Sequence, residues 1–136
     1  MTDVAAVADE LTIRNAVARL AHLADFGTDL DEYVDIFAPD AVWDFPGAAR
    51  RGHADIRAGA VDRRATGTVG PGSNTRHVIT TQAVRVDGDV AESDSYFLFY
   101  VDTVEAPRLF NMGHYADRFE RTPAGWKLAH RRITLG

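Results

Sequence analysis

The chain has 136 residues, of which 46% are hydrophobic and 26% charged, and its formal net charge is -5. This length and composition fit one globular domain over residues 1–136 with a core of its own. The sequence contains no cysteine, which excludes disulfides and thiolate chemistry and is consistent with a cytoplasmic location. Its basic residues are scattered among acidic ones, so we expect no nucleic-acid partner. No apolar run approaches the ~20 residues of a membrane span, so we expect no membrane partner either.

The first half of the chain predicts three helices. The first carries apolar residues at helical spacing and is followed by Gly27, a residue typical of helix ends. These apolar residues are Ile13, Ala16, Val17, Leu20 and Ala24. A short second helix is expected to begin after Asp29 and to end at Pro39, with Leu30, Tyr33, Val34 and Phe37 on its apolar face. A short strand over 41–45 and a third helix after Gly52 follow.

The second half predicts strands, separated by turns. Residues 66–74 form a glycine-rich loop, which is either a pocket flap or a plain connector. The strands that follow are expected over 75–86, 90–101, 108–121 and 126–135. Helices first and an antiparallel meander afterwards indicate an α+β fold. A long sheet with helices on one face tends to curl, so we expect a strongly curved, mostly antiparallel sheet around an apolar pocket.

Strand alternation sorts the side chains of each strand onto two faces. On the strand over 75–86, one face carries His77, Ile79, Thr81 and Ala83. On the strand over 90–101, one face carries Glu92, Asp94, Tyr96, Leu98 and Tyr100. The opposite face of that strand is more apolar, with Ser95, Phe97, Phe99 and Val101, and is either core or a dimer interface. For the strand over 108–121, alternation does not decide whether His114 or Tyr115 points inward.

Two residues are candidates for acid-base chemistry. Asp25 lies at the C-terminal end of the first helix, where the helix dipole and partial burial both disfavour a charged carboxylate. Such a carboxyl group can exchange protons near neutral pH, although a solvated or capping aspartate is the plainer alternative. His77 interrupts an apolar strand, so it is either catalytic or a hydrogen-bonded core histidine. The spacing of the two residues does not show whether they meet.

The other histidines give no metal signal. His22 is expected to form a surface pair with Asp25, His53 to be exposed, and His130 to pack or lie in an interface. No two histidines have the spacing of metal ligands, so we expect no metal. The sequence also lacks a phosphate-binding loop and a GxSxG nucleophile elbow.

Several strings, in order and spacing, resemble the SnoaL-like polyketide cyclase and dehydratase family of the nuclear transport factor 2-like superfamily. They cover nearly the whole chain: Leu20–Asp25, Phe37–Asp44, Gly52–Arg57, Thr75–His77, Gly113–Asp117 and Gly125–Arg132. The resemblance implies a cone-shaped sheet, with three N-terminal helices, around a deep apolar pocket, as in scytalone dehydratase and bile acid 7α-dehydratase. Asp25 and His77 match the Asp-His pair that moves a proton in those enzymes. Their tyrosines near Leu20 and Asp44 have no counterpart here, so cyclisation, isomerisation and pure binding stay open beside dehydration.

The resulting hypothesis is a cofactor-free acid-base enzyme, acting as a cyclase, isomerase or dehydratase. Its substrate would be a small apolar carbonyl-bearing metabolite, such as a polyketide-type intermediate. His77 would remove a proton and Asp25 would orient the imidazole. Residues expected to bind the substrate are Asp44, Asp94, Tyr96, Tyr100, His114 and Tyr115. The alternative is a non-catalytic small-molecule binding protein of the same fold.

We also expect a homodimer that forms through the sheet. Phe97, Phe99 and the strand of Trp126 would form an apolar outer face, which is large for a monomer.

Overall fold

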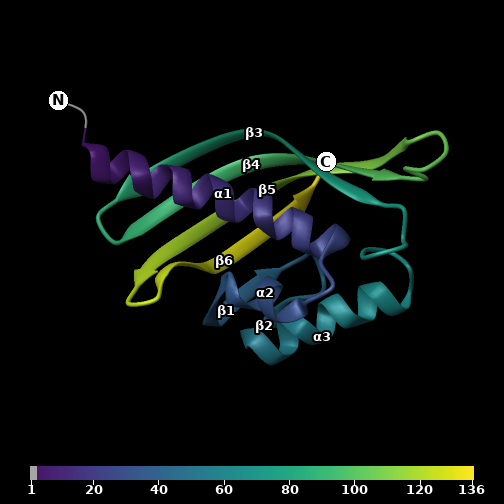
Figure 1. Ribbon diagram of the computed structural model, residues 1–136, viewed down its shortest axis with the longest axis horizontal. Helices are drawn as coiled ribbons and strands as arrows, with labels where there is room; N and C mark the ends of the chain where they lie inside the picture. The colour runs from purple at the N-terminus through teal and green to yellow at the C-terminus, as the bar shows by residue number, and fades with distance from the viewer. Residues whose placement is uncertain (1–2) are drawn as a thin grey trace.

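The computed structural model describes residues 3–136 and shows a long helix lying across a curved sheet, with two shorter helices near one edge (Figure 1). The helices are α1 (Val4–Phe26), α2 (Leu30–Asp35) and α3 (Gly52–Ala65). The strands are β1 (Phe37–Asp44), β2 (Arg50–Arg51), β3 (Arg76–Asp87), β4 (Val90–Val101), β5 (Arg108–Thr122) and β6 (Gly125–Leu135). The predicted α+β fold is therefore confirmed.

The six strands form one sheet in the order β2-β1-β6-β5-β4-β3. Strands β3 to β6 make the predicted antiparallel meander, and β1 pairs with β6 in parallel. The sheet is curved and does not close on itself. Its concave face lies toward α1, which contacts β3 (Figure 1).

The start of β1 differs from the prediction. Phe37 was assigned to the second helix, but α2 ends at Asp35 and β1 already begins at Phe37. Pro39 lies inside the strand rather than at a helix end. The pairing of β1 with β6 is irregular between Phe37 and Val42. The missing N–H of Pro39 therefore removes no hydrogen bond from a regular ladder.

The predicted alternation of β3 holds only for its first residues. The register of β3 against β4 shifts between Ile79 and Gln82, which marks a β-bulge. A bulge adds one residue and reverses the faces beyond it. Thr81 and Ala83 are consequently exposed, although they were predicted to share a face with His77.

The apolar stripe of α1 forms the centre of the core. Ile13, Val17 and Leu20 are buried in one cluster with Phe119 and Leu128 of the sheet. None of the helices within residues 3–136 is both long enough and apolar enough to cross a membrane.

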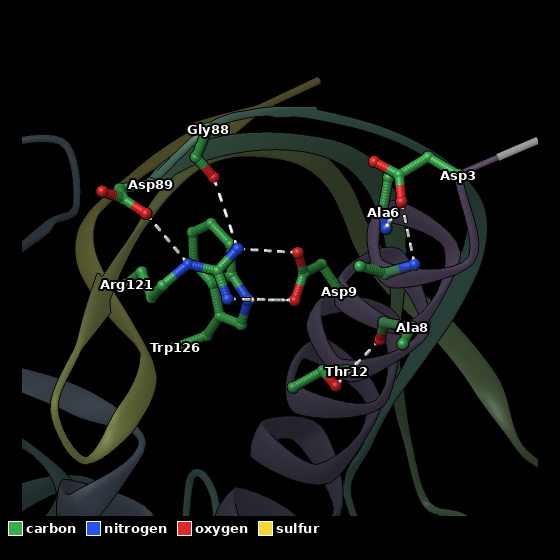
Figure 2. Close-up of polar contacts among 10 residues, drawn as sticks. Asp3, Ala6, Ala8, Asp9, Thr12, Gly88, Asp89, Arg121 and Trp126 are labelled. Atoms are coloured by element: carbon green, nitrogen blue, oxygen red, sulfur yellow. Dashed lines mark hydrogen bonds and ion pairs between the residues drawn. The ribbon is translucent and has the colours of Figure 1, made fainter.

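Polar contacts hold the first turns of α1 to the ends of the strands (Figure 2). Asp3 caps the helix, since its Oδ1 accepts the N–H of Ala5 at 3.0 Å. Asp9 accepts hydrogen bonds from Arg121 Nη2 at 2.7 Å and from Trp126 Nε1 at 3.0 Å. The bond from Arg121, followed by that from Trp126, lowers the pKa of Asp9. These contacts anchor the helix above the sheet.

Two of the residues on which the homodimer was predicted, Phe97 and Phe99, are not exposed, whereas the strand of Trp126 is partly exposed. Phe97 and Phe99 are 4% and 7% exposed and lie on the concave face of the sheet. The prediction assigned them to the outer face because alternation alone does not say which face the helices cover. The outer face carries other exposed apolar side chains, among them Val78, Tyr96 and Met112.

Candidate functional site

A cavity of about 440 Å³ lies between the concave face of the sheet and the helices. Its walls are mainly apolar and aromatic, with Leu20 and Ala24 from α1 and Phe97 and Phe99 from β4. Polar side chains enter it in two groups. The first comes from β2, α3 and the following loop: Arg50, Asp62, Arg63 and Thr68. The second comes from α2 and the sheet: Tyr33, His77, Asn111, Tyr115 and Arg131.

Asp25 and His77 meet at the wall of this cavity. Asp25 is 3% exposed at the end of α1, and its Oδ2 accepts the backbone N–H of His77 at 2.8 Å. Its Oδ1 lies 2.8 Å from Nδ1 of the His77 ring. One carboxylate therefore fixes both the strand and the imidazole. His77 lines the cavity, and Asp25 lies behind it.

This arrangement leaves the second ring nitrogen of His77 available for chemistry. An ionised carboxylate only accepts hydrogen bonds, so the neutral ring beside it holds its proton on Nδ1 and a lone pair on Nε2. No side-chain or backbone group within residues 3–136 is hydrogen bonded to Nε2. The ring packs against Phe99 and Phe97, with centroid distances of 4.7 Å and 6.1 Å, which restricts its orientation. The pair can accept a proton at Nε2 and stabilise the resulting imidazolium through Asp25.

A second buried pair joins β5 to β6. Arg131 Nε donates to Asp117 Oδ1 at 2.8 Å, and its Nη2 donates to Oδ2 at 2.9 Å. The two residues lie opposite each other in the ladder, and both side chains are almost fully buried. Burial alone lowers the pKa of Arg131, but the charge and hydrogen bonds of Asp117 outweigh it and raise that pKa. The guanidinium therefore stays charged.

Tyr115 lies between this pair and the aromatic floor of the cavity. The guanidinium of Arg131 is 3.7 Å from the centroid of its ring, and Phe97 stacks on it at 4.5 Å. Burial raises the pKa of Tyr115, although Arg131 opposes this, so the hydroxyl keeps its proton and can donate to a ligand. Gly113 makes room for Phe97, because a Cβ at Gly113 would lie 2.5 Å from the Phe97 ring.

Of the six residues predicted to bind substrate, Tyr115 lines the cavity. Asp94, Tyr96 and His114 lie on the outer face of the sheet, where His114 Nε2 is 3.0 Å from Asp94 Oδ1. Their predicted contact with a ligand in the cavity does not agree with this placement. The reason is strand alternation: with Phe97 and Phe99 inward, their even-numbered neighbours on β4 point outward.

The remaining two predicted residues are also outside the cavity lining. Asp44 is at the end of β1, where its Oδ2 lies 3.8 Å from Arg132 Nε. Tyr100 is on the last part of β4, and the register of β4 against β5 shifts between Phe99 and Tyr100. Neither residue is among those that surround the cavity.

Sequence reasoning missed most of the polar residues that line the cavity: Tyr33, Asn111 and Arg131 of the second group, and Arg50, Asp62, Arg63 and Thr68 of the first. Tyr33 was assigned to the apolar face of the second helix, which is buried as predicted. For Arg131 a signal existed, because Asp117 shares a strand face with Tyr115 and Phe119, and a charge on a buried face needs a partner. Asn111 gave no signal, but its side-chain oxygen is buried without a hydrogen-bond partner in the structure of residues 3–136. That same part of the chain brings together no group of three or more His, Asp or Glu side chains that could hold a metal ion.

Comparisons with known proteins agree with this architecture. A family model described as a SnoaL-like domain matches residues 5–132. A variant of the protein Rv3472 of Mycobacterium tuberculosis, described as of unknown function, is 26% identical with a TM-score of 0.80 over 94% of this chain and 72% of that chain. ActVI-ORFA of Streptomyces coelicolor is 22% identical, with a TM-score of 0.75 over 90% of this chain and 94% of that chain.

A third solved structure contains a small molecule. It comes from Catenulispora acidiphila in complex with S-DNPA and is 22% identical, with a TM-score of 0.79 over 95% of this chain and 94% of that chain. Among the curated proteins, no match to this chain is found.

Proposed function

The chain belongs to the SnoaL-like domain family, some members of which are polyketide cyclases, and from this premise we propose that it is a cofactor-free acid-base enzyme. Its substrate would be a small, mainly apolar, carbonyl-bearing metabolite. The observation that carries the proposal is the double hydrogen bond of Asp25 to His77, whose ring lines a mainly apolar cavity and whose Nε2 has no hydrogen-bond partner within residues 3–136. Nothing in this arrangement requires a cofactor.

The proposed first step is a proton transfer. His77 Nε2 takes a proton from the carbon next to the substrate carbonyl, and the C–H electron pair becomes the double bond of an enolate. Asp25 stabilises the imidazolium that forms. The hydroxyls of Tyr33 and Tyr115 are the donors available to an enolate oxygen. The imidazolium then returns the proton: to another carbon in an isomerisation, to the alkoxide formed when the enolate carbon attacks a second carbonyl in a cyclisation, or to a β-hydroxyl that leaves as water in a dehydration.

The size and walls of the cavity support a substrate of two or three rings. A volume of about 440 Å³ falls within the range of ligand pockets, which is roughly 300–1,000 Å³. Aromatic walls from Trp43, Phe97 and Phe99 favour flat molecules such as polyketide-type intermediates. The complex of the similar Catenulispora acidiphila protein with S-DNPA shows that a protein of this fold takes up a small molecule.

A generic ketone can test the acid-base pair without knowledge of the natural substrate. β-Tetralone is a bicyclic ketone whose α-protons exchange with D₂O, and NMR follows the loss of their signals. We expect the wild-type protein to accelerate this exchange above the rate in buffer. Asp25→Asn and His77→Ala should each lower the protein-dependent rate by about 100- to 10,000-fold, the usual contribution of a positioned acid-base group.

The outer pair provides matched controls. Asp94→Asn and His114→Ala change the same residue types at nearly the same separation, but outside the cavity, and should leave the exchange rate unchanged. Unchanged exchange in both Asp25→Asn and His77→Ala would contradict the assignment of the pair. If β-tetralone binds to the wild type by calorimetry and its exchange stays at the rate in buffer, the protein is a binding protein instead.

A further inference from the structure

In both buried pairs, the nitrogen-containing side chain lines the cavity and the carboxylate does not. His77 and Arg131 line it, whereas their partners Asp25 and Asp117 do not. The carboxylates thus lie behind the wall and the nitrogen groups face the interior. Tyr115 adds a hydroxyl that keeps its proton. A ligand therefore meets the acceptor nitrogen Nε2 at His77 and donors at Arg131 and Tyr115.

The two pairs are at opposite ends of one row of side chains. Arg131 of β6 stacks on Tyr115 of β5, Tyr115 on Phe97 of β4, and Phe97 packs against His77 of β3. Each residue comes from the next strand of the sheet. Neighbouring strands are about 4.8 Å apart, so three steps separate the two ends by roughly 14 Å along the sheet. A single ligand atom cannot contact both ends, but a molecule of two or three rings can lie along the row.

The guanidinium of Arg131 has N–H groups that Asp117 does not bind. A guanidinium carries five N–H groups, and Asp117 accepts one from Nε and one from Nη2. No acceptor within residues 3–136 is paired with Nη1. Asp117 therefore occupies one edge of the guanidinium and leaves the other edge to a ligand. An anion at that edge would be closer to the cation than to Asp117, so attraction exceeds repulsion.

We infer that the Arg131 end of this row is a binding subsite for an anionic oxygen of the ligand, either a carboxylate or an ionised enol or phenol. This inference rests on the proposed function and specifies its substrate class: a flat acid of two or three rings. The acidic end of the substrate lies at Arg131 and Tyr115, and the substrate carbon that loses its proton lies at His77. Asp117 is a positioning residue, because it holds the guanidinium without reaching the cavity.

Three naphthalene probes of the same shape test the subsite. β-Naphthoate carries a carboxylate, β-naphthamide is its neutral counterpart, and β-naphthol shows by absorbance whether it is bound ionised. Calorimetry should show that the wild type binds β-naphthoate about 10- to 100-fold more tightly than β-naphthamide if the oxygen is a carboxylate, the usual effect of a hydrogen bond to a charged group. If it is an ionised enol or phenol, β-naphthol should bind as its anion at a pH where the free compound is neutral.

The variants remove the subsite without leaving a lone buried charge. The double variant Arg131→Met with Asp117→Leu replaces the pair by apolar residues of similar size, a change that buried pairs tolerate. It should fold by circular dichroism and lose the preference for the anion. Arg132→Met is the matched control, since Arg132 is the next residue on β6 and its side chain is exposed. His77→Ala should keep the preference, so the subsite and the acid-base proposal can fail independently.

Two other cations line the same cavity, Arg50 and Arg63, and Arg50 already forms ion pairs with Asp55 and Asp62. The guanidinium of Arg63 lies 4.7 Å from the Trp43 ring centroid, and its variant Arg63→Met should retain the preference for the anion. The inference is overturned if the wild type prefers neither anion, if the folded double variant keeps the wild-type preference, or if Arg63→Met alone abolishes it.

Discussion

An aspartate-histidine pair lies at each of the two faces of the sheet, and the inner aspartate comes from α1. Asp25 and His77 meet on the concave face at 2.8 Å, and Asp94 and His114 meet on the outer face at 3.0 Å. The side chains of the inner pair are 2% and 18% exposed, whereas those of the outer pair are 62% and 34% exposed. The inner carboxylate also accepts a backbone N–H, which the outer one does not.

The contrast shows that surroundings, and not residue types, give such a pair its role. Water competes for every hydrogen bond of the outer pair and screens its charges, so the pair contributes little to stability. The inner pair is sheltered from water by α1 and the aromatic walls, where electrostatic interactions are stronger. A proton accepted by His77 would therefore be stabilised by Asp25, and its acceptor nitrogen faces a site for a ligand.

Removing the carboxylate from each pair should give the largest difference between them. Asp25→Ala leaves the buried N–H of His77 without an acceptor, so we expect a loss of about 1–3 kcal/mol in the free energy of unfolding. Asp94→Ala should change it by less than about 0.5 kcal/mol, as for most exposed positions. Urea unfolding measures both values. Asp25→Asn retains an acceptor and should lie between them, and equal losses for the two alanine variants would contradict the comparison.

A second copy of the chain that covered the outer pair would shelter it from water and remove its difference from the inner pair. We propose a homodimer through the outer face, where Val78, Tyr96 and Met112 are exposed beside Asp94 and His114. Patches of apolar residues that also carry an acid and a base can pair with themselves about a two-fold axis. Sedimentation should then show a dimer at micromolar concentration. Tyr96→Lys should weaken it by about tenfold or more, since buried aromatic residues dominate interfaces. A wild-type monomer would contradict the proposal.

The parts of the fold that depend on local pattern could be predicted from the sequence. The stripe of α1 and the four long strands follow from periodicity, which neighbouring residues determine. The β-bulge between Ile79 and Gln82 could not be predicted, because it depends on pairing with β4. The same holds for Pro39, which the sequence alone indicates as a helix end. Its place in β1 depends on the irregular contact with β6.

The site was predictable one residue at a time, but its assembly was not. The end of a helix and an apolar strand marked Asp25 and His77 as unusual. Their hydrogen bond joins residues that are 52 positions apart, and no local pattern reports such a contact. The same limit holds for Asp117 and Arg131. Alternation places each charge on one face of its strand but does not decide which face points inward. For Phe97 and Tyr96, on opposite faces of β4, alternation allowed either face to point inward, and the packing of the helices decided which one does.

The smallest expected difference between the two pairs concerns the position of a single proton. Asp25 approaches Nδ1 of His77, whereas Asp94 approaches Nε2 of His114, and a carboxylate holds the protonated nitrogen of a neutral ring. Neutral His77 should therefore carry its proton on Nδ1 and neutral His114 on Nε2. Proton-nitrogen correlation spectra of the labelled protein distinguish the two forms. A ligand such as β-naphthol should shift the Nε2 signal of His77 and leave both nitrogen signals of His114 unchanged. If the neutral ring of His77 carries its proton on Nε2, the free lone pair assigned to it is wrong, and another group must be the base.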